Sequence, residues 1–145
     1  MQNILLSKGT LSTGVFAFLV KNNSALMGLR NYTKDTWKDV SVWTSPGGRS
    51  DDTETIEETL RREVYEETGI AEFEIVDYIG KADGAQGDDK VHFFYCVTDK
   101  EPKLMEPDKF SEWKWVPMKE YLEDDAYGGF NPRTRKAIVK FLHEK

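Results

Sequence analysis

The sequence predicts a small domain of the α+β class, and three observations support this. Apolar runs of strand length recur along the chain, a helix with an apolar stripe interrupts them near the middle, and an amphipathic helix ends the chain. The chain has 145 residues, 39% of them hydrophobic, which suffices for one core burying about two-thirds of the unfolded surface. One domain over residues 1–145 is expected.

Six segments have the composition and length of strands. They are Gly14–Val20, Ala25–Arg30, Trp43–Arg49, Glu72–Gly80, Lys90–Thr98 and Glu112–Met118. A polar stretch from Asn31 to Lys38 and a glycine- and aspartate-rich loop from Asp83 to Asp89 separate some of them, and the loop is a candidate for lying near a ligand. The final helix is expected from Pro132 to His143, with Asn131 as a candidate cap.

The first helix is expected after the turn at Pro46-Gly47-Gly48, because three apolar residues recur at helical spacing: Ile56, Leu60 and Val64. Gly69 is the expected stop. The candidate N-caps are Asp51, Asp52 and Thr53, followed by acidic residues expected in the first turn: Glu54, Glu57 and Glu58.

Three carboxylates on this helix form the candidate site. Glu63, Glu66 and Glu67 are spaced i, i+3 and i+4, so they leave one helix face within about one turn. At about 100° per residue, Glu67 falls between Ile56 and Leu60, on the side that should face the core. Like charges held this close repel, and hard oxygen ligands in this arrangement indicate a divalent cation, Mg²⁺ or Mn²⁺.

The segment from Gly48 to Ile70 reads GRSDDTETIEETLRREVYEETGI and fits the pattern G-x5-E-x7-R-E-U-x-E-E-x-G-U, where U is aliphatic. This segment resembles the Nudix box, the signature of the Nudix hydrolases. The resemblance implies an α/β/α sandwich around a mixed β-sheet. It also implies Mg²⁺-dependent hydrolysis of a nucleoside diphosphate linked to another group X.

The same resemblance assigns roles to individual residues. Glu63, Glu66, Glu67 and the Gly47 carbonyl resemble the metal ligands, and Arg62 and Glu54 resemble the residues that orient this cluster. A carboxylate is needed as general base.

Two residues are candidates for the base: Glu66 on the helix, and Glu106 in the loop before the Glu112–Met118 segment, where MutT-type members carry a further glutamate. Asp108 is a rival to Glu106, and an acidic loop without a role is the alternative.

Candidate substrate contacts lie outside the box. Arg30 and Arg49 are plausible phosphate clamps, although either is equally explained as a surface charge. Asn131 resembles by position the asparagine that reads the base in MutT-type nucleotide hydrolases, and a helix cap explains it equally well.

Downstream of the box, the proline typical of ADP-ribose hydrolases and the tyrosine typical of dinucleoside polyphosphate hydrolases are both missing. By this elimination, and by the resemblance of Glu106 and Asn131 to MutT-type members, the expected substrate is a nucleoside triphosphate, cleaved to monophosphate and pyrophosphate. A nucleoside diphosphate sugar or a dinucleoside polyphosphate is the alternative. A non-catalytic nucleotide-sensing module is a further hypothesis, but such modules typically lose the box glutamates, which are present here.

Composition narrows the partners to a small-molecule nucleotide. A net charge of −6 argues against general nucleic-acid binding through a basic surface. No segment has the apolar length of a membrane helix or the form of a secretory signal, so a cytoplasmic protein is expected. Cys96 is the only cysteine, which excludes an internal disulfide, and its apolar strand predicts a buried thiol.

Substitution of Asn131 by alanine separates the two interpretations of this residue. Loss of a base contact should reduce discrimination between a purine and a pyrimidine triphosphate by about 1–3 kcal/mol in kcat/KM. Loss of a cap should lower the free energy of unfolding by about 0.5–2 kcal/mol and leave selectivity alone. Kinetics on both triphosphates and a melting curve decide, and a lower melting point with an unchanged kcat/KM ratio would exclude base recognition.

Overall fold

The structure is a computed structural model, and it describes residues 1–31, 42–83, 89–128 and 132–144. Asn131, most of the predicted polar stretch and the centre of the Asp83–Asp89 loop lie outside the described residues. The elements in chain order are α1 (Gln2–Leu6), β1 (Thr13–Lys21), β2 (Ser24–Arg30), β3 (Val42–Thr44), β4 (Gly47–Arg49), α2 (Ile56–Thr68), β5 (Glu74–Asp83), β6 (Lys90–Val97), β7 (Phe110–Pro117), α3 (Met118–Glu123), a 3₁₀ turn (Asp125–Tyr127) and α4 (Pro132–His143).

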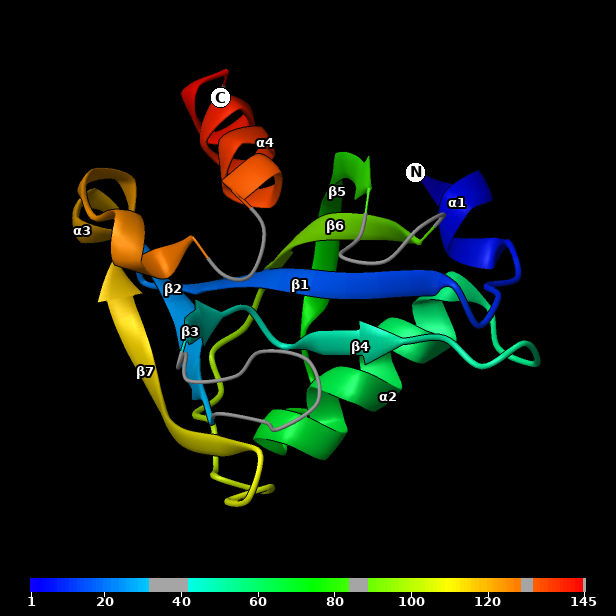
Figure 1. Cartoon of the computed structure of the whole chain (residues 1–145), viewed down its shortest axis with the longest axis horizontal. Helices are drawn as coiled ribbons and strands as arrows, with labels where there is room; N and C mark the ends of the chain where they lie inside the picture. Colours follow the sequence, from blue (N-terminus) through cyan, green and yellow to red (C-terminus); the bar gives the residue numbers. More distant parts are fainter. Residues whose placement is uncertain (32–41, 84–88, 129–131, 145) are drawn as a thin grey trace.

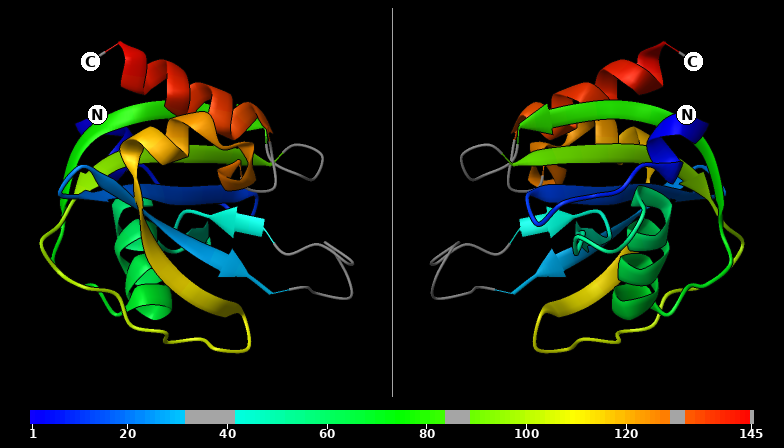
Figure 2. Two further views of the ribbon diagram at one scale, coloured as in Figure 1. Left: turned by 90° about the vertical axis from the view of Figure 1, so that its left-hand side faces the viewer. Right: turned by 90° about the vertical axis from the view of Figure 1, so that its right-hand side faces the viewer.

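In the described part of the chain, seven strands form one mixed sheet in the order β3-β2-β1-β6-β5, with β4 paired to β1 and β7 paired to β2. The β1–β6 pair is parallel and the others are antiparallel. The α+β class and the mixed sheet are thereby confirmed. Helix α2 lies on one side of the sheet and α3 and α4 on the other (Figures 1 and 2), which is the expected α/β/α sandwich.

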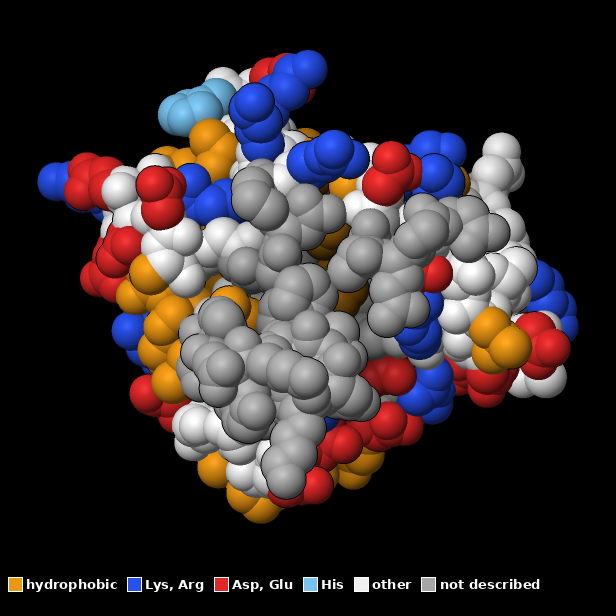
Figure 3. Space-filling view, viewed as in Figure 1, with side chains coloured by type: hydrophobic (Ala, Val, Ile, Leu, Met, Phe, Trp, Pro, Cys, Tyr) orange, Lys and Arg blue, Asp and Glu red, His pale blue; other side chains and the backbone are white. Residues whose placement is uncertain are grey.

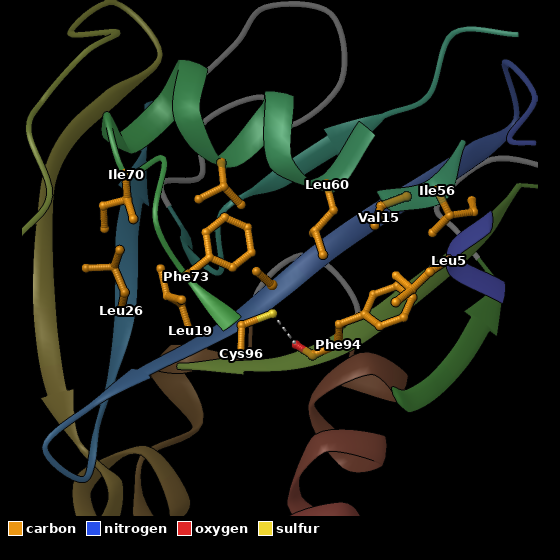
Figure 4. Packing of buried hydrophobic residues seen from close by; sticks show 12 residues of the cluster. Leu5, Val15, Leu19, Leu26, Ile56, Leu60, Ile70, Phe73, Phe94 and Cys96 are labelled. Atoms are coloured by element: carbon orange, nitrogen blue, oxygen red, sulfur yellow. Dashed lines mark hydrogen bonds between the residues drawn. The ribbon is translucent and has the colours of Figure 1, made fainter. Parts of the chain in front are cut away.

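The two faces of the sheet carry separate cores, because side chains alternate along each strand. In β1, Val15, Ala17 and Leu19 pack toward α2, and Phe18 and Val20 belong to the opposite cluster. Figure 4 shows the α2 side, where residues from α1, β1, β2, α2 and β6 meet. Cys96 is buried there, and burial raises the pKa of its thiol, as expected of a structural cysteine.

The sheet forks beside β1, and this positions the loop that carries the box glycines. Strand β2 pairs with β1 only next to the hairpin turn, at Val20↔Ala25 and Lys21↔Ser24. Strand β4 then takes the place of β2, because Gly47 pairs with Phe16 along the first half of β1. The start of the box is therefore held against a central strand.

The predicted strands are present with boundaries shifted by a few residues, with one correction. The expected Trp43–Arg49 strand is two strands, β3 and β4, which pair with different partners. Pro46 lies between them and has no N–H to donate to a ladder, while its carbonyl accepts from Ala17 N at 2.9 Å. The short elements α1 and α3 were not predicted, because neither is long enough to show a helical period.

The start of α2 also differs from the prediction. Its N-cap is Thr55, not Asp51, Asp52 or Thr53. Thr55 Oγ1 accepts from Glu58 N at 3.2 Å, and Thr55 N donates to Glu58 Oε1 at 2.9 Å, which completes a capping box. Glu54 consequently precedes the helix instead of lying in its first turn. Gly69 ends the helix as predicted, with a left-handed φ of 74°.

Thr55→Ala should lower the free energy of unfolding by about 0.5–2 kcal/mol, because it removes the hydroxyl that caps α2. Asp52→Ala is the matched control, since Asp52 is exposed and was an alternative cap. Urea denaturation of both variants checks this. An equal loss in both would contradict the cap assignment.

Candidate active site

The apolar stripe of α2 places the acidic residues. Ile56, Leu60 and Val64 are buried against the sheet, which confirms the predicted helix and its orientation. Glu67, the next residue along this side, is only 1% exposed. The carboxylate expected to face the core therefore does so, and this requires polar partners inside.

Glu67 finds partners for both oxygens. Oε1 accepts from Gly47 N at 2.9 Å, and Oε2 accepts from Lys109 Nζ at 2.7 Å. Burial nevertheless raises the pKa of Glu67 to about 7, against the opposing effects of Lys109 and the Gly47 N–H. Trp113 Nε1 donates to the Glu67 backbone carbonyl at 3.1 Å, which ties β7 to the same turn of α2.

Glu63 lies against the second glycine of the turn. A Cβ on Gly48 would stand 2.4 Å from the Glu63 carboxyl carbon, so this carboxylate fills the space that a side chain would need. Burial raises the pKa of Glu63, and Arg62 and Lys109 oppose this. Glu63 and Glu67 thus meet at the Gly47–Gly48 backbone.

Gly47 itself must be glycine. Its φ is 158°, and a Cβ there would lie 2.2 Å from the Val15 carbonyl oxygen. No flexible side chain can move to relieve that contact, because the obstacle is the backbone of β1.

Arg62 joins three carboxylates, those of Glu54, Glu63 and Glu66. It binds Glu54 through two bonds, Nε to Oε2 at 2.6 Å and Nη2 to Oε1 at 2.9 Å. Its Nη1 reaches Glu63 at 3.0 Å and Glu66 at 3.1 Å, and Nη2 also donates to the Arg49 carbonyl at 3.2 Å. These contacts lower the pKa of Glu54, chiefly through the hydrogen bond from Arg62. Arg62 and Glu54 are therefore placed to orient the cluster.

Glu106 lies beside this cluster. Lys109 Nζ is 3.8 Å from Glu106 Oε1, so the same ammonium faces Glu67 and Glu106. Oε1 of Glu106 is buried and has no hydrogen-bond partner among the described residues. Asp108 is exposed. Lys109 was not predicted as a site residue; its place three residues after Glu106 was the available signal.

The candidate substrate contacts Arg30 and Arg49 each interact with other residues of the protein. Arg30 ends β2 opposite Phe110, with its guanidinium carbon 5.7 Å from the ring centroid. Arg49 binds Asp89 at 2.5 Å and the Leu11 carbonyl at 3.2 Å, so its guanidinium is engaged by the protein. Asn131 lies outside the described residues.

The donor set fits a hard divalent cation. Within the described residues, no three acidic, histidine or cysteine side chains already stand in ligand geometry, because Arg62 and Lys109 hold the carboxylates. However, Glu63 and Glu67 converge on one glycine turn, and the buried Oε1 of Glu106 lacks a hydrogen bond nearby. On the face shown in Figure 3, acidic side chains gather over the region of α2. Carboxylate oxygens are the ligands that Mg²⁺ and Mn²⁺ take.

A family model described as the NUDIX domain matches residues 10–138. The chain belongs to this family. Membership confirms the predicted enzyme class, a hydrolase of phosphoric anhydride bonds.

Solved structures show the same fold. A MutT protein from Methanosarcina mazei Go1 is similar at 24% identity and a TM-score of 0.72, over 91% of this chain and 93% of that one. A MutT NUDIX hydrolase from Burkholderia pseudomallei is similar at 23% identity and a TM-score of 0.66, over 87% and 94%. An ADP-ribose pyrophosphatase from Streptococcus suis 89-1591 is similar at 15% identity and a TM-score of 0.65, over 90% and 91%.

Among the described residues, no helix has both the length and the apolar composition that a membrane crossing requires.

Gly48→Ala and Gly47→Ala should fail in different ways. The atoms nearest to the new methyl group at position 48 belong to the movable end of Glu63, so the variant should fold with near-normal stability and lose most hydrolytic activity. The methyl group at position 47 meets the β1 backbone, so this variant should lose stability by about 1–3 kcal/mol. Melting curves and turnover rates of both variants test this. Full activity in Gly48→Ala would show that the position of Glu63 does not matter.

Proposed function

We propose that the protein is a Mg²⁺-dependent Nudix hydrolase that cleaves a nucleoside triphosphate to a monophosphate and pyrophosphate. The observation that carries the proposal is the packing of Glu63 and Glu67 against the Gly47–Gly48 turn. A buried carboxylate is costly, and its retention beside two further acidic residues is best explained by a cation.

The metal would be held by Glu63, Glu66, Glu67 and the Gly47 carbonyl. When bound, Mg²⁺ or Mn²⁺ supplies charge neutralisation for phosphate oxygens and lowers the pKa of a water molecule. The protein's own task is positioning: Arg62 fixes Glu63 and Glu66 through Nη1 and is itself held by Glu54. This arrangement restricts how the carboxylates can turn before substrate arrives.

The general base belongs to the carboxylates that water can reach. The Glu66 side chain is 47% exposed and that of Glu106 is 35% exposed, whereas Glu67 is almost completely enclosed. Glu66 stays the first nominee because it lies on the same helix turn as the ligands. Glu106, in the loop before β7, is the alternative.

Two of the structural relatives are named MutT, and Glu106 lies beside the box, in line with a MutT-like nucleoside triphosphate pyrophosphatase. Arg30 and Arg49 are proposed phosphate contacts; Arg49, whose side chain is about half exposed, would exchange Asp89 for a phosphate. Nucleoside diphosphate sugars and dinucleoside polyphosphates are the alternative substrates. The presence of all the box glutamates argues against a module that senses a nucleotide without hydrolysing it.

A substrate screen with purified protein tests the proposal. Nucleoside triphosphates should be hydrolysed with Mg²⁺ or Mn²⁺, activity should vanish in chelator, and Ca²⁺ should support little turnover because it coordinates at longer distances. Glu67→Gln is the control, because the amide keeps the shape but not the charge. Preferred cleavage of a nucleotide sugar would correct the substrate, and full activity in chelator would overturn the metal mechanism.

A further inference from the structure

The Lys109 ammonium contacts carboxylates from two parts of the chain, Glu67 on α2 and Glu106 in the loop before β7. Lys109 precedes β7, and its Nζ lies 2.7 Å from Glu67 Oε2 and 3.8 Å from Glu106 Oε1. Its charge also acts on Glu63. The ammonium therefore faces one proposed metal ligand, Glu67, and one candidate base, Glu106.

The position of Lys109 conflicts with that of a metal ion. Glu67 has one oxygen on Gly47 N and the other on Lys109 Nζ, so Oε2 is the oxygen left for a cation. A divalent ion bound to Oε2 would stand within a few ångströms of the ammonium, and like charges that close repel strongly at a buried site. The two cations therefore compete for Glu67 Oε2.

The two neighbouring cations differ in how easily they can leave. Arg62 uses Nε, Nη1 and Nη2 in its contacts, including the two-bond pair with Glu54. Lys109 makes one short bond, and its side chain is 30% exposed. A flexible four-carbon stem with a single short contact can swing out toward solvent, whereas the guanidinium is fixed.

We propose that Lys109 is a built-in counter-ion of the metal site, which holds Glu67 and Glu106 while no divalent cation is bound and is displaced from Glu67 Oε2 when one binds. The proposal rests on the proposed function, since it requires the metal site. It adds that Lys109 sets the affinity of the site for the metal, because Lys109 and the metal compete for Glu67.

Metal titration of three variants tests this without substrate. Lys109→Met removes the competing charge and should tighten Mn²⁺ binding about tenfold, equivalent to about 1.4 kcal/mol. Lys109→Gln keeps a neutral donor to Glu67 and should tighten it less; this variant also serves if the methionine variant does not fold. Lys103→Met removes an equal charge from an exposed position in the same loop and should change the affinity by less than about twofold.

Isothermal titration with Mn²⁺ gives the dissociation constants, and melting curves give a second measurement. Without metal, Lys109→Met should melt below wild type, and saturating Mn²⁺ should remove most of the difference. Unchanged or weaker Mn²⁺ binding in both Lys109 variants, relative to Lys103→Met, would overturn the proposal.

The outcomes distinguish a failure of the counter-ion proposal from a failure of the proposed function. Tighter binding in the Lys109 variants, with no nucleotide hydrolysed by wild type, would support the counter-ion and refute the proposed function. Hydrolysis by wild type with equal Mn²⁺ affinity in all variants would support the proposed function and refute the counter-ion role of Lys109. Absence of any Mn²⁺ binding by wild type would overturn both.

Discussion

The burial of one carboxylate constrains most of this structure. Glu67 occupies a position on α2 that helical spacing assigns to the core, and it is almost fully enclosed. A charged group in such a place needs hydrogen bonds and a counter-charge, or it becomes neutral. Two contacts meet this need: the N–H of Gly47 and the ammonium of Lys109.

The glycine turn and the forked sheet serve the same constraint. For Gly47 N to reach Glu67, the turn must run directly alongside β1, and β2 must diverge to make room for β4. Only glycine fits position 47, because the β1 backbone occupies the place of a side chain. Gly48 is required for a different reason, since the Glu63 carboxylate occupies its side-chain volume. The two adjacent glycines therefore leave room for the β1 backbone beside position 47 and for the Glu63 carboxylate beside position 48.

Local sequence predicted the parts of the fold that depend on local spacing. The apolar period of α2, its stop at Gly69 and the inward direction of Glu67 all follow from residues within a few turns of one another. The cap was misplaced because several polar residues precede the helix, and only the reciprocal bonds of Thr55 and Glu58 decide between them. The division of Trp43–Arg49 depended on which strands diverge, which is a property of the whole sheet.

The least predictable member of the site was Lys109. It lies 42 residues from Glu67 in the chain, and no periodic pattern links the two. A lysine in an acidic loop is ordinarily a solvated charge, so composition gave no reason to place it inside. The reason becomes visible only once β7 is paired with β2, because that pairing carries the preceding loop to the end of α2.

The division of labour between Arg62 and Lys109 follows from the chemistry of the two side chains. A guanidinium offers several donors in a fixed plane, and Arg62 uses them to join Glu54, Glu63 and Glu66 into one rigid arrangement. An ammonium is a compact charge on a flexible stem, which suits the exchangeable counter-ion role that we propose for Lys109. If both positions carried arginine, two multiply bonded cations would occupy the ligands; if both carried lysine, the carboxylates would lose their fixed orientation. The observed pair allows a cluster of acidic groups to be held in shape and still exchange its counter-ion.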